Sequence, residues 1–335
     1  MYLYILLVLA LLFYSFKKSN LRIQRAFDIH IINACQFLLA LSIVMAHLSQ
    51  FLKVPWLRVF TTCGGWAVPI FFFVSGYGLY YSLEHKNSYL KGFLYKRLGK
   101  ILIPFLMSSL LYVWLFWYNG CDLHSRYFSW YGISLFTLPY SWFVQSIIVF
   151  YVLFYISNLL FRNRFKSILF ILISVIFYEA YRWYIGCVPN SFFAGICFPM
   201  GMILCWKETE IELFLKRLKT YYFILVIVGF TLVALVTYDS FGKIYAAIMF
   251  YLLTRFVSKG NILLELIHKS IDKSKLSRIS YEVYLSQGIA FLALKSKIVN
   301  LSSPFYYSIA CVLICVAISG GVYLVTKQLN KILNI

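Results

Sequence analysis

His47 is the residue of this chain whose type and position best suit acid–base chemistry. It lies in the apolar segment INACQFLLALSIVMAHLSQF, residues 32–51, and histidine titrates near neutral pH without help, so it can act as a general base. Residues eleven apart point in nearly the same direction on a helix, which gives this segment one polar stripe. Two interpretations stay open: a general base in a cavity, or a buried histidine that hydrogen-bonds a neighbouring helix. The stripe consists of Asn33, Gln36, Ala40, Val44, His47 and Gln50.

Three cations, Lys96, Arg97 and Lys100, lie close together in KGFLYKRLGKILIP, residues 91–104. Lys96 and Lys100 are four residues apart and would share a helix face. Such a cluster can clamp the phosphates of a ligand. It can equally be a basic anchor at the membrane boundary.

Small residues interrupt the aromatic segment GGWAVPIFFFVSGYGL, residues 64–79. Gly76 and Gly78, with Ser75, would let the backbone of a neighbouring helix approach closely, as small residues do in membranes. The pattern therefore predicts either a helix crossing or a polar site around Ser75.

Two acidic residues also fall in apolar segments, where ionisable groups are expensive and mark functional sites by default. Glu179 and Arg182 are three residues apart and lie among aromatic side chains that include Trp183. This group could hold a sugar, or it could be a local ion pair in an aromatic belt. Glu282, in ISYEVYLSQG (279–288), stands where an acid suits the start of a helix.

These residues belong to a chain that is too apolar for a soluble protein. Of its 335 residues, 62% are hydrophobic, 20% aromatic and only 13% charged, whereas soluble domains are about half apolar and about a quarter charged. The net charge of +20 does not indicate a nucleic-acid partner, because the basic residues lie in short loops between apolar segments. The expected fold class is all-α, a polytopic bundle of transmembrane helices in a lipid bilayer.

The eight cysteines are scattered. They form no CxxC motif and no Cys/His grouping at zinc spacing. We expect neither a disulfide framework nor a metal site.

A spanning helix needs about 20 mainly apolar residues, and eleven segments approach this requirement. Lysine and arginine gather in cytoplasmic loops. If the loop 17–30 is cytoplasmic, 24 of the 31 basic residues fall in inner segments, so the amino terminus is outside and the carboxyl terminus inside. The predicted spans are 1–16, 31–52, 65–83, 101–118, 142–161, 167–185, 192–206, 220–237, 241–257, 279–294 and 304–326.

Five segments, taken in order, resemble the motifs of the acyltransferase-3 family of bacterial membrane proteins. The family's first core span reads Asp, two residues, Arg, ten residues, His, and the matching positions here are Asn33, Gln36 and His47. Asn33 and Gln36 thus depart from the family's acid and cation. The other four segments are PIFFFVSGYGL, KRLGKILIP, SWFVQSIIVFYVLFY and ISYEVYLSQ, the last with Gln287 where the family often has His.

The resemblance implies a ten-span core with both ends cytoplasmic, which is what remains when the first predicted span is removed. We therefore expect an extra transmembrane segment and basic linker over 1–30 and a membrane acyltransferase domain over 31–335. The implied reaction moves an acetyl or other short acyl group from acetyl-CoA to a hydroxyl of a carbohydrate. The implied acceptor is a cell-surface polysaccharide or its lipid-linked precursor, and the implied location is the bacterial cytoplasmic membrane.

Residue types and resemblance together predict a role for each candidate. His47 is the catalytic base, and no residue is expected to hold a metal. The supporting residues are Asn33, Gln36, Ser75 and Gln287; the acetyl-CoA phosphates are assigned to Lys96, Arg97 and Lys100; the acceptor is assigned to Glu179, Arg182 and Trp183.

Two other classes of envelope protein share this composition. A polysaccharide polymerase or flippase would also be polytopic and aromatic-rich, but a polymerase would carry a large outer loop, and the predicted outer loop 119–141 is short. A transporter would favour broken helices in two matching halves, and the sequence shows no such symmetry. Both remain alternatives to the acyltransferase.

The charge distribution predicts that Lys96 faces the cytoplasm and that Arg126 and Lys295 face outward. Single cysteines at these positions, in a cysteine-free background, would be treated with a membrane-impermeant thiol reagent. Positions 126 and 295 should react in intact cells, and position 96 only after permeabilisation. Reaction of position 96 in intact cells would contradict the predicted orientation.

Overall fold

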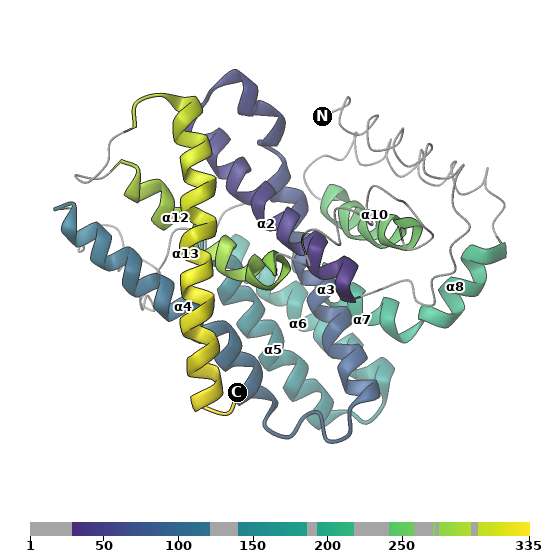
Figure 1. Cartoon of the computed structure of the whole chain (residues 1–335). Helices are drawn as coiled ribbons and strands as arrows, with labels where there is room; N and C mark the ends of the chain where they lie inside the picture. Colours follow the sequence, from purple (N-terminus) through teal and green to yellow (C-terminus); the bar gives the residue numbers. More distant parts are fainter. Residues whose placement is uncertain are drawn as a thin grey trace. The chain divides into compact units, whose positions relative to one another are not determined.

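The computed structural model describes residues 29–120, 140–185, 193–217, 241–257, 271, 275–295 and 301–335, and these residues form helices without a β-strand (Figure 1). The chain divides into two compact units. The first comprises Met1–Gly64, Lys96–Val144 and Thr254–Ile335, and the second comprises Gly65–Tyr95 and Gln145–Leu253. We describe each unit by itself.

The helices divide between the units as follows, with η marking a 3₁₀ helix. The first unit contains α2 (Ile29–Leu52), η1 (Pro55–Phe60), most of α4 (Phe93–Tyr118), η3 (Leu276–Ile279), α12 (Ser280–Ala293) and α13 (Pro304–Ile332). The second contains most of α3 (Cys63–His85), most of α5 (Trp142–Leu160), α6 (Arg164–Tyr184), α7 (Cys197–Trp206), α8 (Glu208–Arg217) and most of α10 (Phe241–Val257).

Local sequence explains several helix starts. Asn163 caps α6, since its side-chain oxygen accepts a hydrogen bond of 3.1 Å from the backbone N–H of Lys166. Proline opens both η1 and α13, at the one helical position where its missing N–H costs nothing.

Among the described residues, five helices are long and apolar enough to cross a membrane. The prediction of a helical membrane protein is confirmed, whereas the count of eleven spans is not. The span predicted at 167–185 lies in α6, which has 21 residues but is not among the five. The spans predicted at 192–206, 241–257 and 279–294 contain helices of 10, 17 and 14 residues, and those predicted at 1–16 and 220–237 lie outside the described residues. The five helices are Cys35–Leu52, Pro55–His85, Phe93–Tyr118, Trp142–Leu160 and Pro304–Ile332.

One predicted boundary is wrong by two turns. The span expected to begin at residue 101 lies in α4, which begins at Phe93 and continues through Pro104 to Tyr118. Hydropathy locates the apolar part of a helix, but the leucine, lysine and arginine side chains before it are good helix formers as well. The three cations Lys96, Arg97 and Lys100 therefore belong to the first two turns of α4.

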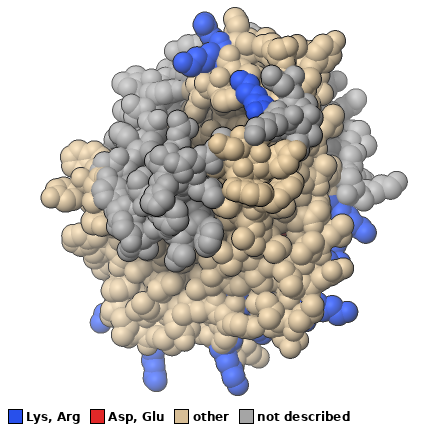
Figure 2. Space-filling model, turned by 90° about the vertical axis from the view of Figure 1, so that its left-hand side faces the viewer, with Lys and Arg blue, Asp and Glu red and all other residues tan. Residues whose placement is uncertain are grey.

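Large apolar side chains are exposed on several helices. The exposed fraction is 71% for Phe177, 67% for Trp117 and 64% for Leu313. Figure 2 shows one face of the molecule, on which the described residues are mostly uncharged, few are basic and none in view is acidic. Exposed apolar surface of this kind is expected where helices contact lipid and is rare on soluble monomers.

In the first unit, α2 and α12 pack against each other and run in the same direction. The rings of Phe51, at the end of α2, and Phe291, at the end of α12, are stacked with centroids 6.0 Å apart. η3, which leads into α12, also packs on α2, so α12 must lie alongside α2 rather than extend beyond it (Figure 1). α13 joins them, because the Tyr307 hydroxyl donates to the Phe291 carbonyl at 2.8 Å.

In the second unit, α3 and α7 cross at two glycines. A Cβ on Gly76 would lie 1.9 Å from the carbonyl oxygen of Phe198, and a Cβ on Gly201 would lie 2.0 Å from that of Phe73. The two backbones thus approach each other at distances that any side chain would prevent. The predicted close approach is confirmed for Gly76, but it is wrong for Gly78, where a Cβ would meet nothing within 4 Å.

This crossing predicts opposite effects for two neighbouring substitutions. Gly76→Ala should destabilise the protein by at least about 1–3 kcal/mol, because the added methyl group has no space. Gly78→Ala should be neutral or stabilising by about 0.5–1 kcal/mol, as alanine is favoured over glycine inside a helix. Thermal unfolding of both variants in detergent would measure the difference, and equal midpoints would contradict the crossing.

Candidate active site around His47

His47 is held on α2 with one ring nitrogen unused. Its Nδ1 atom is buried and has no hydrogen-bond partner. The side chain of Gln50, one turn further along α2, lies near the ring. In the tautomer that carries its proton on Nε2, Nδ1 is a neutral acceptor, which is the state that a general base needs.

Tyr140 packs on the imidazole. The two rings are stacked with centroids 3.8 Å apart and an angle of 26° between their planes. The backbone of Tyr140 has φ 67°, a conformation that is unusual for a bulky residue and persists only where surrounding contacts hold it. Here the Tyr284 hydroxyl donates to the Tyr140 carbonyl, and the Tyr140 ring meets Phe291 edge-on at 6.4 Å.

Tyr140 is a site residue that the sequence analysis missed. It lies within the predicted outer loop 119–141, two residues before α5 begins at Trp142, so neither hydropathy nor helical spacing singles it out. Burial raises the pKa of its phenol, so the ring beside His47 stays neutral at physiological pH. Its proximity to His47 depends on a contact between residues 93 positions apart, which is visible only in the folded chain.

Gln287 lies on α12 at the level of His47. The two helices run in the same direction, and the rings of Phe51 and Phe291 are stacked. His47 is one turn before Phe51 on α2, and Gln287 is one turn before Phe291 on α12. Gln287 also shares its helix face with Tyr284 and Phe291, three residues before it and four after it, and both of these contact Tyr140. His47 and Gln287 therefore occupy corresponding positions, one turn back from the stacked rings, on two helices that pack against each other.

Aromatic rings and one cation line the α2 end beyond His47. Phe51 is 44% exposed, and the Lys295 ammonium lies 4.4 Å from the centroid of its ring and 5.8 Å from that of Tyr307. Such cation–π contacts hold a lysine in place without neutralising it. This end of the first unit thus combines an exposed aromatic surface with an oriented positive charge.

The basic cluster belongs to the same unit, at the start of α4. Lys96 and Lys100 are exposed and Arg97 is half-buried. The hydroxyl of Tyr281, in the first turn of α12, donates to the carbonyl of Ile101 at 3.1 Å, so the residue after Lys100 is fixed against α12. From Tyr281 to Gln287 the axis of α12 rises only about 9 Å.

Asn33 and Gln36 are half-buried in the first half of α2. At 1.5 Å per residue, Gln36 is about 16 Å and Asn33 about 21 Å along the axis from His47, so neither can touch the imidazole. Of the polar residues in the stripe, Gln50 is the one that lies a single turn from His47. Another supporting role for Asn33 and Gln36 stays a prediction.

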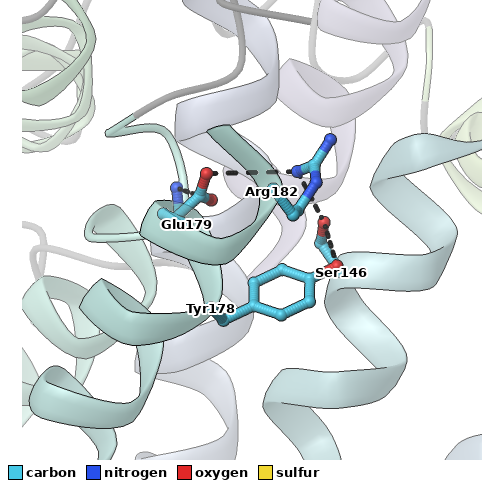
Figure 3. Close-up of polar contacts among 5 residues, drawn as sticks. Ser146, Tyr178, Glu179 and Arg182 are labelled. Carbon is cyan, nitrogen blue, oxygen red and sulfur yellow. Dashed lines mark hydrogen bonds and ion pairs between the residues drawn. The ribbon is translucent and has the colours of Figure 1, made fainter. Parts of the chain in front are cut away.

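Glu179 and Arg182 form a buried brace in the second unit (Figure 3). Their charged groups are 4.0 Å apart, and only 2% and 5% of the two side chains is exposed. Glu179 accepts a hydrogen bond of 3.2 Å from the N–H of Gly195, and Arg182 donates to Ser146 on α5, also at 3.2 Å. The pair thus ties α6 to α5 and to the turn before α7.

Trp183 does not join this pair. Its side chain is 66% exposed, because one residue further along α6 turns it about 100° away from Arg182. The three residues predicted to hold a carbohydrate therefore do not form one face, and their role in acceptor binding stays a prediction. Ser75 lies half-buried on α3, also in the second unit.

No three histidine, cysteine, aspartate or glutamate side chains among the described residues lie close enough together to hold a metal ion. Comparison with known proteins gives one match. A family model described as an acyltransferase domain matches residues 29–324, nearly the whole chain. No curated protein and no solved structure matches the sequence.

The buried brace predicts that its two charges are needed together. Arg182→Met leaves a carboxylate buried without its cation, which typically costs about 3–5 kcal/mol. Adding Glu179→Gln removes the orphaned charge, so the double variant should unfold at a higher temperature than Arg182→Met alone. A double variant no more stable than the single one would show that the two charges act independently.

Proposed function

This chain belongs to the acyltransferase-3 family, and from that premise we propose that it transfers an acetyl or other short acyl group from acetyl-CoA to a hydroxyl group of a carbohydrate. The carbohydrate is a cell-surface polysaccharide or its lipid-linked precursor. The membrane is the bacterial cytoplasmic membrane, with the carboxyl terminus of the chain inside. The family and the apolar helices together indicate a multi-pass membrane acyltransferase, and the donor, the acceptor and the orientation are the proposal.

The observation that carries the proposal is the unused, buried Nδ1 of His47. In the proposed reaction, Nδ1 of His47 accepts the proton of the acceptor hydroxyl. At the same time, the oxygen of that hydroxyl attacks the carbonyl carbon of the thioester. The carbon–sulfur bond then breaks, and the imidazolium returns the proton to the departing thiolate. General base catalysis of this kind contributes about 10²–10⁴-fold, and positioning of the two substrates supplies much of the remainder.

Tyr140 and Gln50 support this role from two sides. The stacked ring of Tyr140 holds the imidazole in place, and the nearby amide of Gln50 offers an oxygen that can accept the proton on Nε2, which would leave a free lone pair on Nδ1. A base whose orientation is held needs little reorganisation when the hydroxyl arrives.

The start of α4 supports the donor assignment. Lys96, Arg97 and Lys100 lie in the first two turns of a helix, and Lys96 and Lys100 are exposed. Cations grouped in this way can bind an anionic ligand. The phosphates of acetyl-CoA, which is a cytoplasmic molecule, are such anions.

Carbohydrate acceptors often bind through stacking on aromatic rings and hydrogen bonds to polar groups. The exposed ring of Phe51 and the oriented Lys295 ammonium lie one turn beyond His47 and offer a surface of this kind. We propose this end of the first unit as the side from which the acceptor hydroxyl reaches His47. Glu179, Arg182 and Trp183 remain proposed acceptor residues, and the test of this role is whether their substitution alters the use of the acceptor.

The test is acyl transfer by membranes that carry variants of His47. His47→Ala and His47→Gln should both lower the rate of acetyl transfer by at least about 10²-fold, since glutamine hydrogen-bonds but provides no usable base. Incorporation of labelled acetyl groups into surface glycan, read by mass spectrometry, would measure the rate. Protein abundance would be measured in parallel.

His85 provides the matched control. It lies at the end of α3, where its Nδ1 donates to the Tyr81 carbonyl at 2.8 Å, and its side chain is exposed, whereas the unused nitrogen of His47 is buried. His85→Gln should transfer acetyl groups at the wild-type rate. Substantial glycan acetylation by His47→Gln would refute the assignment of the base.

A further inference from the structure

Gln287 is a polar side chain that the proposed mechanism leaves unexplained. It is completely buried, and neither its amide nitrogen nor its amide oxygen has a hydrogen-bond partner. A primary amide carries two donor hydrogens and an acceptor oxygen, and burying it unpaired costs several kcal/mol where no water is present. An apolar residue of the same size would suit this position better if stability alone mattered.

Some buried hydroxyls of the first unit are paired. Tyr284 and Tyr307 both donate their hydroxyls to backbone carbonyls. Ser319 on α13 is fully buried as well, and its hydroxyl donates to the Cys315 carbonyl at 2.6 Å. The unpaired buried groups of α12 are the Gln287 amide, the Ser286 hydroxyl and one carboxylate oxygen of Glu282.

Two arguments place the amide at the reacting groups. First, Gln287 and His47 lie at the same level of two helices that run in the same direction, one turn back from the stacked rings of Phe51 and Phe291. Second, Gln287 is on the face of α12 whose other members, Tyr284 and Phe291, contact Tyr140, and Tyr140 covers the imidazole.

We propose that Gln287 is a catalytic residue whose amide N–H donates a hydrogen bond to the carbonyl oxygen of the acyl group. The inference rests on the acyl transfer proposed above. As the hydroxyl oxygen of the acceptor attacks, the electron pair of the C=O bond moves onto that oxygen, and the hydrogen bond from Gln287 strengthens. When the carbon–sulfur bond breaks, the pair returns to re-form C=O, so Gln287 gives up no proton and is unchanged at the end.

The other unpaired groups of α12 do not fit this role. The Ser286 hydroxyl and one carboxylate oxygen of Glu282 are also buried without a partner. Both residues lie on another face of α12, because Ser286 is turned about 100° around the helix from Gln287 and Glu282 is one turn before Ser286. On α12, Gln287 is thus the unpaired donor on the face that contacts Tyr140.

The test combines activity with stability, because the two respond differently to a catalytic and a structural amide. Gln287→Met conserves the volume of the side chain and removes the donor. Loss of one oxyanion donor typically lowers kcat by about 10²–10³-fold. We expect this loss with KM for acetyl-CoA and for the acceptor within about twofold of wild type, and a thermal midpoint in detergent equal to or above that of wild type, since an unpaired buried amide has been removed.

Thr326→Val is the matched control, with the opposite expectation. Thr326 is almost fully buried in the same unit, but its hydroxyl is satisfied by the Tyr323 carbonyl at 3.0 Å. This variant should lower the thermal midpoint slightly and leave kcat unchanged. Gln287→Leu serves as a second apolar variant and should behave as Gln287→Met does.

Two outcomes would overturn the proposal. If kcat of Gln287→Met stays within threefold of wild type, the amide does not act on the oxyanion. If both the Met and Leu variants lose their thermal stability, the amide has a structural role. Failure of the proposed function itself is distinguishable, because the wild-type protein would then transfer no acetyl group at all.

Discussion

Water is absent from the hydrocarbon interior of a membrane, so each polar side chain on a spanning helix must find a partner in the protein or leave its hydrogen-bonding capacity unused. In the second unit, a buried polar pair finds partners in the protein. Glu179 and Arg182 neutralise each other, and backbone and serine groups satisfy much of the remaining capacity. The first unit leaves hydrogen-bonding capacity unused at His47 and Gln287. The brace in the second unit is not fully satisfied either, because the Oε2 atom of Glu179 has its ion pair with Arg182 but no hydrogen bond.

The same constraint explains what could be predicted from the sequence. His47 is conspicuous because it is an ionisable residue in an apolar segment, and helical periodicity correctly places Gln50 beside it. The acidic and basic residues of α6 are equally conspicuous, but spacing alone cannot distinguish a sugar site from an internal ion pair. That distinction depends on Ser146 and Gly195, which come from two other parts of the chain.

Features that arise only from packing could not be predicted. Gly76 and Gly78 are two residues apart and look alike in the sequence, yet Gly76 alone faces α7, because positions two apart on a helix point in nearly opposite directions. Tyr140 reaches His47 through a tertiary contact that no local pattern encodes. The predicted start of the span in α4 is too late, because hydropathy detects where the apolar part of the helix begins and not where the helix itself begins.

The crossing of α3 and α7 bears on how the protein is assembled in the membrane. α7 has ten residues and is therefore about 15 Å long, half the thickness of the hydrocarbon core. Such a helix cannot be released into lipid as a span of its own and needs a protein surface to receive it. α3 precedes α7 in the chain and presents Gly76 as the place where α7 docks, so the receiving helix is already synthesised when α7 emerges from the ribosome. Biogenesis of the second unit thus depends on chain order, with an early helix acting as the template on which a later, shorter one is retained.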